Sequence, residues 1–285
     1  MSKLKIAIQK NGRLSEKSLE LLKSCGIQLS IGDRHLKANS QNFPIEVLFL
    51  RDDDIPQYVE QGVADIGILG ENEVWEKDKA VNTIKKLGFA TCKLSLAIPK
   101  DEDYNDLFYF NNKKIATSYP KILSNFFKEK NITVEIEEIS GSVEIAPGIG
   151  LADAIFDIVS TGSTLLMNGL KEVEVVTYST AVLISKNNLS ATKQKILDKL
   201  VFRIDAVRAA LENKYIVLNA PETAIESISS ILPGMKSPSI FPLSEAGWVS
   251  IHSVVKEDDF WNVIDKLKQA GAEGILVVPI EKMIL

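Results

Sequence analysis

The sequence is poor in cysteine and has no long apolar run, and each absence excludes a class of protein. It has two cysteines, Cys25 and Cys92, and no C-x-x-C pair, so neither a disulfide framework nor an iron–sulfur cluster is expected. No apolar segment approaches the length that spans a bilayer, and residues 4–8 are too few for the apolar core of an export signal. We therefore expect a soluble cytoplasmic protein.

A strong excess of one charge is also lacking. The 285 residues have a formal net charge of −5, with 45% hydrophobic and 25% charged residues, which is the composition of a globular protein. No nucleic-acid or membrane partner is expected, because a general binder of either kind would need a marked basic excess. The length suggests about two domains.

Two common phosphate-binding motifs are absent. No segment fits G-x-x-x-x-G-K-[ST], so nothing indicates the phosphoryl-donor site of a P-loop enzyme. Residues 62–70 lack the G-x-G-x-x-G spacing of dinucleotide-binding folds. So does Gly148-Ile149-Gly150, because Asp153 stands where the third glycine would be.

What the sequence does contain is a short apolar segment, residues 154–159, that runs into hydroxyl residues and one glycine. A buried strand followed by such a turn presents free backbone N–H groups, which bind anions together with hydroxyl donors. Gly162 lets the backbone approach an oxygen atom closely. We expect a terminal phosphate to be held by Ser160, Thr161, Gly162, Ser163 and Thr164.

Acidic residues stand close to this phosphate loop in the sequence. Asp157 would repel a phosphate unless it faced another group, and the hydroxyls of a ribose are donors that a carboxylate accepts. The loop alone fits equally well a strand–turn–helix with capping hydroxyls and a solvated aspartate. Together with Glu144 and Asp153, Asp157 favours a sugar phosphate as the ligand.

Strand and helix patterns alternate along the first two thirds of the chain. Strands at residues 4–9, 45–50, 62–70, 114–117 and 154–159, and a helix with Ser15 as its N-cap, predict a doubly wound α/β body in two lobes. The lobes are expected to join at residues 93–100 and 179–186, and residues 190–211 to form a long helix that packs on the body. From residue 214 the order becomes β-α-β-β-α-β.

The predicted domains follow from this order. They are residues 1–92 with 183–213 for the first lobe, 93–182 for the second lobe with the phosphate loop, and 214–285 for the C-terminal domain. From its pattern alone, the C-terminal domain fits regulator binding and oligomerisation equally.

The three aspartates at 52–54 could bind a metal, but capping of a helix start is the simpler interpretation. His35 is expected at the surface, and His252 is expected to be structural.

Several motifs, read in order, resemble the ATP phosphoribosyltransferase family, which catalyses the committing step of histidine biosynthesis. The similarity is carried by Asn11-Gly12-Arg13, Arg51 with Asp54-Ile55-Pro56, residues 62–70, Gly141-Ser142-Val143-Glu144, Ala146-Pro147, residues 150–154, residues 157–165, Ser237-Pro238-Ser239 and Pro242-Leu243. It covers essentially the whole chain and is similar to the long form of the family.

The resemblance implies an α/β fold: a two-lobed, periplasmic-binding-protein-like catalytic body with a C-terminal ferredoxin-like (βαββαβ) regulatory domain. It also implies transfer of the phosphoribosyl group of 5-phosphoribosyl 1-diphosphate (PRPP) to N1 of ATP, with release of pyrophosphate and a need for Mg²⁺. ATP is then the nucleophile, which agrees with the missing P-loop. Inhibition by histidine and a homo-oligomer, from dimer to hexamer, are implied as well.

The resemblance assigns roles residue by residue. The catalytic residues are expected to be Arg13, Arg34 and Asp157. The PRPP-binding residues are expected to be Glu144, Asp153, Asp157, Ser160, Thr161, Gly162, Ser163 and Thr164. ATP or pyrophosphate is expected at Lys10, Gly12, Arg13, Arg34, Arg51 and Gly70, where guanidinium groups suit phosphate oxygens. Mg²⁺ is expected at Glu144 and Asp157.

Histidine, as inhibitor, is expected in the C-terminal domain, at Asn219, Met235, Ser239, Val254 and Gly274. Asn219 stands where the family has an aspartate, and Ser239 where threonine is usual. Because the missing carboxylate removes a charge-assisted bond to the histidine α-amino group, weaker feedback is expected. Gly148 stands where an arginine often follows the Ala-Pro pair, and the sequence does not indicate what replaces that charge.

Two other interpretations stay open from the sequence. A two-lobed solute-binding or sensor protein would share the fold without the chemistry, although the chain lacks an export signal and has the acids and the phosphate loop. A salvage phosphoribosyltransferase of the purine type has paired acids before Thr-Thr-Gly, whereas Phe156 stands before Asp157 here.

Overall fold

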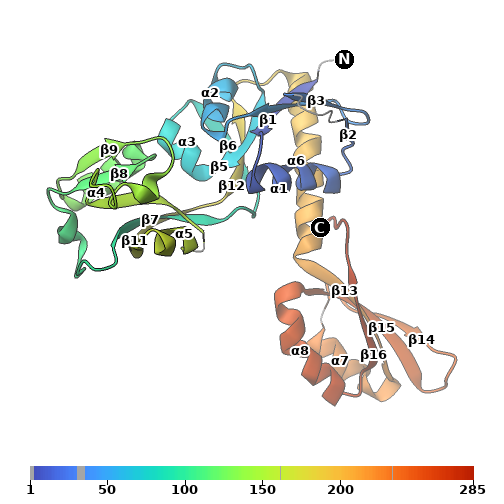
Figure 1. Ribbon diagram of the computed structural model, residues 1–285. Coiled ribbons are helices and arrows are strands. Elements are labelled where there is room, and N and C mark those ends of the chain that lie inside the picture. The colour runs from blue at the N-terminus through green and yellow to red at the C-terminus, as the bar shows by residue number, and fades with distance from the viewer. Residues whose placement is uncertain (1–2, 31–35, 161, 233) are drawn as a thin grey trace. The chain divides into compact units, whose positions relative to one another are not determined.

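The structure is a computed structural model that describes residues 3–30, 36–160, 162–232 and 234–285 (Figure 1). The chain forms two compact units. One comprises Met1–Glu20 with Ile27–Gln194, and the other Leu21–Gly26 with Lys195–Leu285. Within the described residues, the first unit contains two β-sheets and the second unit one. No helix in this part of the chain is long and apolar enough to cross a membrane.

The first sheet is built around the buried strand β1 (Leu4–Gln9). β1 pairs in parallel with β4 (Ile45–Leu50) and with β5 (Ile66–Gly70), so the carboxyl ends of three strands lie at one edge. The described strands follow the order β2-β3-β4-β1-β5-β12-β6. The further elements of this lobe are β2 (Leu29–Ser30), β3 (Lys37–Ser40), β6 (Val81–Lys86), β12 (Ala181–Lys186), α1 (Arg13–Ser24), α2 (Ile55–Glu60) and α3 (Glu71–Lys77).

The second sheet has the order β11-β7-β10-β8-β9 and contains the stretch that the sequence singled out. Its central strand β10 (Ala154–Val159) has the predicted bounds, because an apolar run with one interruption forms a strand buried on both faces. Aromatic residues, among them Phe110, Phe127 and Phe156, fill one face of the sheet. The further elements are β7 (Cys92–Pro99), β8 (Lys114–Thr117), β9 (Glu135–Glu138), β11 (Leu170–Ser179), α4 (Pro120–Lys130), α5 (Ser163–Met167) and the 3₁₀ turns η2 (Leu107–Phe110) and η3 (Val143–Ile145).

The chain crosses between these sheets twice, which confirms the predicted two-lobed α/β body. The outward crossing lies between β6 and β7, in residues 87–91. The expected crossing at residues 93–100 is wrong, because Leu94 and Leu96 belong to β7 and are buried in the second sheet. The chain returns through Thr180, whose hydroxyl donates to the carbonyl oxygen of Phe89 at 2.9 Å, so the two crossings are bonded to each other.

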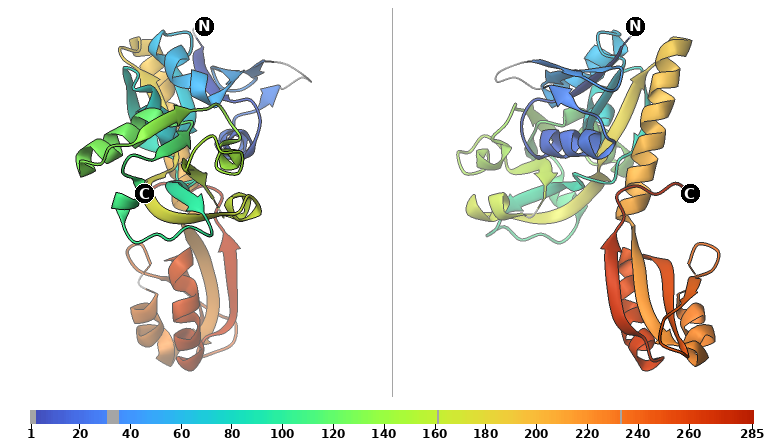
Figure 2. Two further views of the ribbon diagram at one scale, coloured as in Figure 1. Left: turned by 60° about the vertical axis from the view of Figure 1, so that its left-hand side comes forward. Right: turned by 90° about the vertical axis from the view of Figure 1, so that its right-hand side faces the viewer.

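The second unit ends in the predicted β-α-β-β-α-β domain. Its sheet has the order β14-β15-β13-β16, and α7 and α8 lie on one face of it (Figure 2). Ile216, Leu218 and Ala220 of β13 are buried, whereas alternate residues face away from that core. The elements are α6 (Ala191–Leu211), β13 (Asn213–Pro221), η4 (Glu222–Ala224), α7 (Ile225–Ile231), β14 (Ser239–Pro242), β15 (Trp248–Lys256), α8 (Glu257–Gln269) and β16 (Glu273–Pro279).

Local details differ from the sequence predictions at helix starts. α1 begins at Arg13, two residues before the expected N-cap, because the Glu16 amide already donates to the carbonyl oxygen of Gly12. The three aspartates form the 3₁₀ turn η1 (Asp52–Asp54), and neither η1 nor α2 has a side-chain cap, so capping is wrong. All three do stand in the first turn of η1, where the helix dipole favours negative charge. Asp53 instead accepts a bond from the Arg51 guanidinium at 3.2 Å.

The structural role of His252 is supported by its 2.8 Å hydrogen bond with the Tyr215 hydroxyl. His35 lies outside the described residues.

One buried carboxylate connects three parts of the first sheet. Asp65 is fully buried before β5, and its carboxylate accepts the Lys5 amide at 2.9 Å. The ammonium groups of Lys186, at the end of β12, and Lys193, at the start of α6, lie 3.1 and 2.6 Å from its oxygens. Burial raises the pKa of Asp65, but the bonds from Lys193, Lys5 and Lys186 outweigh it and lower the pKa below its ordinary value.

Replacing this carboxylate should destabilise the first unit. Asp65→Asn leaves two partly buried ammonium groups without their counter-charge, and we expect a loss of about 2–3 kcal/mol in the free energy of unfolding, measured with urea at pH 7. Because the folded-state pKa is lowered, the Asp65 contribution is present above the unfolded pKa of about 4 and is lost as the pH falls through the folded value. The difference between the two proteins should therefore shrink in acid.

A matched control is Asp78→Asn, which breaks an ion pair with Lys121 whose side chains are 72% and 43% exposed. It should cost much less than Asp65→Asn, because solvent screens an exposed ion pair. An equal loss for both variants would show that Asp65 has no special role.

Candidate functional site

The predicted phosphate loop connects β10 to α5 at the carboxyl end of β10. Gly162 has a φ of +77°, which glycine adopts without strain, and a Cβ at this position would meet nothing within 4 Å. Ser160, Ser163 and Thr164 are exposed, and no acidic residue stands in the first turn of α5. The strand–turn–helix was thus predicted correctly. Thr161 lies outside the described residues.

Asp157 and Glu144 lie close together beside this loop. Asp157 alternates with Ile155 and Val159, so it points to the face of β10 that η3 and α5 cover, where Val143 and Leu165 pack. Burial raises the pKa of Asp157 to about 6, the Ile158 amide bond at 2.7 Å opposes this, and the negative charge of Glu144 raises it further. The two carboxyl groups therefore interact electrostatically, as a shared site requires.

Asp153 lies at the other end of β10. Its carboxylate accepts the Lys114 amide at 2.8 Å, and its own amide donates to the Lys114 carbonyl oxygen at 2.8 Å. Asp157 follows four positions later along the extended chain, a distance of about 13 Å. Of the three acids that the sequence grouped together, the structure brings only Glu144 and Asp157 to the loop.

The basic residues predicted for phosphates cluster at the edge where β1, β4 and β5 end. The Lys10 amide donates to the Leu50 carbonyl oxygen at 2.8 Å, which places Lys10 beside Arg51. Arg13 opens α1, directly after Gly12, and both are exposed. Gly70 ends β5, where any Cβ would collide with the Asn72 side chain. Arg34 lies outside the described residues.

A buried polar cluster, which the sequence reasoning missed, links the two lobes. It consists of Asn72 and Glu73 from the first turn of α3, Tyr119 before α4, and Ser179 at the end of β11. Asn72 donates to the Glu73 carboxylate at 3.1 Å and to the Tyr119 hydroxyl at 3.3 Å, and accepts from the Ser179 hydroxyl at 2.7 Å. The position of Glu71-Asn72-Glu73 directly after a central parallel strand could have indicated a ligand-facing segment.

The charges around this cluster show that site residues of the two lobes converge. Burial raises the pKa of Glu73 to about 7, and the negative charge of Asp52 in the first lobe adds to it. Burial, followed by the charges of Glu73 and Asp157, raises the pKa of Tyr119. Tyr119 thus lies within electrostatic range of acids from both lobes. Because burial disfavours the charged forms of Glu73 and Asp157, a cation or a hydrogen-bond donor of a ligand would favour the charged form of either carboxyl group.

The donor set allows a divalent metal that is shared with a substrate. No group of three or more His, Cys, Asp or Glu side chains that could hold a metal exists among the described residues. Glu144 and Asp157 supply two carboxylates, and Mg²⁺ characteristically uses one or two carboxylates with water and substrate phosphates.

In the C-terminal domain, three of the predicted histidine positions lie on the face of the sheet opposite the helices, and the other two line a cavity. Asn219 pairs with Ser250, and Ser239 pairs with His252, so their side chains share this face. A Cβ at Gly274 would lie 3.7 Å from the Asn219 amide nitrogen. Met235 and Val254 both line a cavity of about 660 Å³ at the end of β15.

Two family models match this chain, one over the two lobes and one over the C-terminal domain. A family model described as ATP phosphoribosyltransferase matches residues 51–206, and one described as HisG, C-terminal domain, matches residues 210–282. An ATP phosphoribosyltransferase of Azobacteroides pseudotrichonymphae is 61% identical over 99% of this chain and 100% of its own. One of Cytophaga hutchinsonii is 59% identical over 99% of this chain and 98% of its own.

A solved structure is also similar. It is an ATP phosphoribosyl transferase (HisG:HisZ) complex from Thermotoga maritima, with a TM-score of 0.60 and 30% sequence identity. The match covers 71% of this chain and 98% of the other.

The closeness of Glu144 and Asp157 predicts a measurable coupling. In Mg²⁺-free buffer, Glu144→Gln should lower the pKa of Asp157 by a small amount, because it removes a like charge while burial, the larger cause, keeps the pKa raised; carboxyl ¹³C NMR titration measures the shift. Because the folded-state pKa is raised, ionising Asp157 opposes folding as the pH rises from about 4 to 6, and the variant should reduce this loss of stability. Glu137→Gln, beside Lys114, is the control, and an equal shift there would contradict the coupling.

Proposed function

The chain belongs to the ATP phosphoribosyltransferase family, in its long form with a C-terminal domain, and on this basis we propose which residues perform the reaction. The enzyme transfers the phosphoribosyl group of PRPP to N1 of ATP and releases pyrophosphate, the first step of histidine biosynthesis. The solute-binding and salvage-enzyme interpretations are therefore wrong.

The phosphoribosyl group binds at β10. Ser160, Thr161, Gly162, Ser163 and Thr164 hold its 5′-phosphate through hydroxyl and backbone N–H donors. Asp157 and Glu144 accept hydrogen bonds from the ribose hydroxyls. The single observation that carries this assignment is the placement of Asp157 on the face of β10 that α5 and η3, which contains Glu144, cover. Asp153, at the opposite end of the strand, is the least supported member of the predicted PRPP set.

The reaction separates charge, and the two lobes supply opposite signs. As the bond from C1 to pyrophosphate breaks, positive charge develops on the ribose ring and negative charge on the leaving group. Asp157 and Glu144 stabilise the ring. Lys10, Arg13, Arg34 and Arg51, with the backbone at Gly12 and Gly70, bind the pyrophosphate or the ATP phosphates, since guanidinium groups pair with two oxygens at once. Adenine N1 already has a lone pair, so Asp157 need not act as a base.

The metal required would be Mg²⁺, bound by Glu144 and Asp157 together with the PRPP oxygens. It would neutralise negative charge on the departing pyrophosphate. Burial, the first cause of the raised pKa of Asp157, disfavours its charged form, and a bound cation would favour that form.

The C-terminal domain would regulate the enzyme by binding histidine at Asn219, Met235, Ser239, Val254 and Gly274. The Thermotoga maritima structure is titled as a complex with HisZ, whereas this chain carries its own C-terminal domain. We expect a cytoplasmic homo-oligomer, from dimer to hexamer.

Turnover tests the catalytic assignment. Incubation with ATP, PRPP and Mg²⁺ should give the absorbance of phosphoribosyl-ATP, and excess EDTA should abolish it until Mg²⁺ is restored. Arg13→Ala should lower kcat by about 100-fold or more, because a group that stabilises the leaving charge is lost. Lys23→Ala, at the other end of α1, should be unaffected. Near-normal turnover of a folded Arg13→Ala protein would remove Arg13 from the mechanism.

Inhibition tests the regulatory assignment. Asn219→Asp restores a carboxylate for the histidine α-amino group and should lower the histidine concentration for half-inhibition by about tenfold, the worth of one charge-assisted bond. Asn125→Asp, exposed on α4, is the charge-matched control. If both variants are inhibited like the unmodified protein, Asn219 does not contact histidine.

A further inference from the structure

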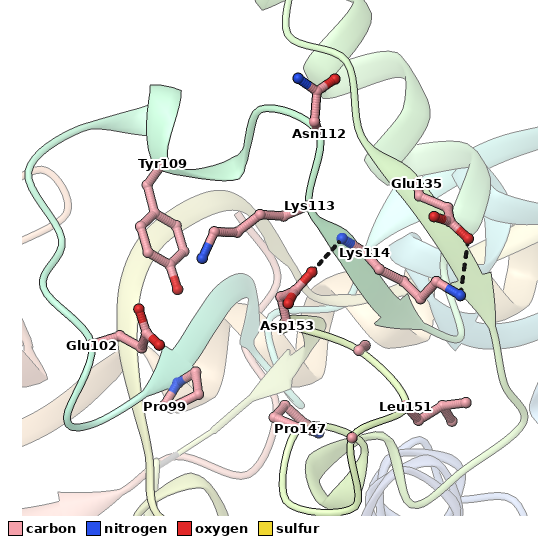
Figure 3. A pocket seen from close by; sticks show the side chains of 12 residues that line it. Pro99, Glu102, Tyr109, Asn112, Lys113, Lys114, Glu135, Pro147, Leu151 and Asp153 are labelled. Carbon is pink, nitrogen blue, oxygen red and sulfur yellow. Dashed lines mark hydrogen bonds and ion pairs between the residues drawn. The ribbon is translucent and has the colours of Figure 1, made fainter.

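A second cavity lies in the same lobe, at the end of β10 away from the phosphate loop (Figure 3). It has a volume of about 530 Å³, within the range of small-molecule sites. Its wall comes from the end of β7, the η2 turn, the starts of β8 and β9, and residues 147–153. The charged and polar residues of the wall are Glu102, Tyr109, Asn112, Lys113, Lys114, Glu135 and Asp153.

Part of this wall is already neutralised within the protein. The Lys114 ammonium lies 2.9 Å from the Glu135 carboxylate and 3.4 Å from that of Glu137. One oxygen of Asp153 accepts the Lys114 amide at 2.8 Å, which leaves its other oxygen toward the cavity. These contacts build a rigid floor, because Lys114 is held at both its backbone and its side chain.

Two further groups point into the cavity without such partners. The Lys113 ammonium lies 3.8 Å from the centroid of the Tyr109 ring, and Figure 3 shows it and the Glu102 carboxylate turned toward one space. Among the described residues, neither Lys113 nor Glu102 forms a side-chain ion pair. Because neither charge has an ionic partner in the described part of the chain, a ligand group of opposite charge can pair with each of them.

The mixture of signs restricts the ligand class. A phosphate would meet Lys113 but would be repelled by Glu102 and Asp153, the acids of the wall that no lysine ammonium neutralises. A divalent cation would be repelled by Lys113, and no metal-binding cluster of three ligands exists among the described residues. A small molecule with one carboxylate and one ammonium group satisfies both sets.

We propose that this cavity is a binding site for a small zwitterion of the α-amino acid class. The ligand carboxylate accepts a bond from the Lys113 ammonium. Its ammonium group donates to Glu102 and to the outer oxygen of Asp153. The site is separate from the phosphoribosyl site and from the C-terminal domain. It gives Asp153 a function at the end of β10 where the structure places it.

The test is a titration of the ¹⁵N-labelled full chain with glycine, the smallest such zwitterion, followed by TROSY NMR. We expect saturable shifts of the amide signals of residues 112–114 and 150–153, with a Kd of about 1–10 mM. Acetate and methylamine, which each carry one half of the charge pair, should shift these signals at least tenfold less at equal concentration and ionic strength.

Two variants probe the two ends of the ligand. Lys113→Gln and Glu102→Gln should each weaken glycine binding about tenfold or more, whereas Lys128→Gln, exposed on α4, should leave it unchanged. All three substitutions change exposed or partly exposed side chains. The amide signals of each variant far from the substitution should stay where they are in the unmodified protein, which shows that the variant is folded. Shifts that do not saturate, equal responses to acetate or methylamine, tight binding of phosphate or Mg²⁺ at these residues, or normal binding by both variants would overturn the proposal.

Discussion

The buried carboxylate of Asp65 is the constraint on which the first lobe depends. β12 belongs to the first sheet but follows the whole second lobe in the sequence. Its position in the sheet therefore depends on contacts between residues that are far apart in the chain. Asp65 fixes it through an ionic contact with Lys186 and ties the start of α6 through Lys193. β1, β4 and β5 run in the same direction, so the contacts of Asp65 at the amino-terminal end of β5 also set the relative positions of the carboxyl ends of these strands. Lys10, Arg51 and Gly70 lie at those carboxyl ends.

The second lobe uses one strand to serve two different ends. The side chains of residues 153, 155, 157 and 159 point to the same side of the extended chain that forms β10. Asp157 interacts electrostatically with Glu144, whereas Asp153, just before the strand, is hydrogen-bonded to Lys114. The phosphate loop follows the end that carries Asp157. Of the acids near the loop in sequence, Glu144 comes close to Asp157 because the chain turns between them. Asp153 does not, because an extended strand separates the two residues.

The fold was predictable where apolar runs dominate. The bounds of residues 4–9, 45–50, 114–117 and 154–159 were predicted correctly, because buried strands need continuous apolar residues. The polar strands β3 and β6 were missed, since their pairing comes from neighbouring strands rather than from their own composition. In the site, Asp157 and Glu144 were found from motif chemistry. Glu73 and Tyr119 were missed because their contact joins two lobes and is purely tertiary.

The return of the chain through Thr180 limits how the lobes can move. A single residue separates β11 from β12, and its hydroxyl is bonded to Phe89 in the other crossing. Such a short, doubled connection acts as a pivot: the lobes can turn about it, but sliding one past the other would break bonds on both connections at once. An inserted residue at this position would therefore change how the two lobes face each other without changing the strands of either sheet.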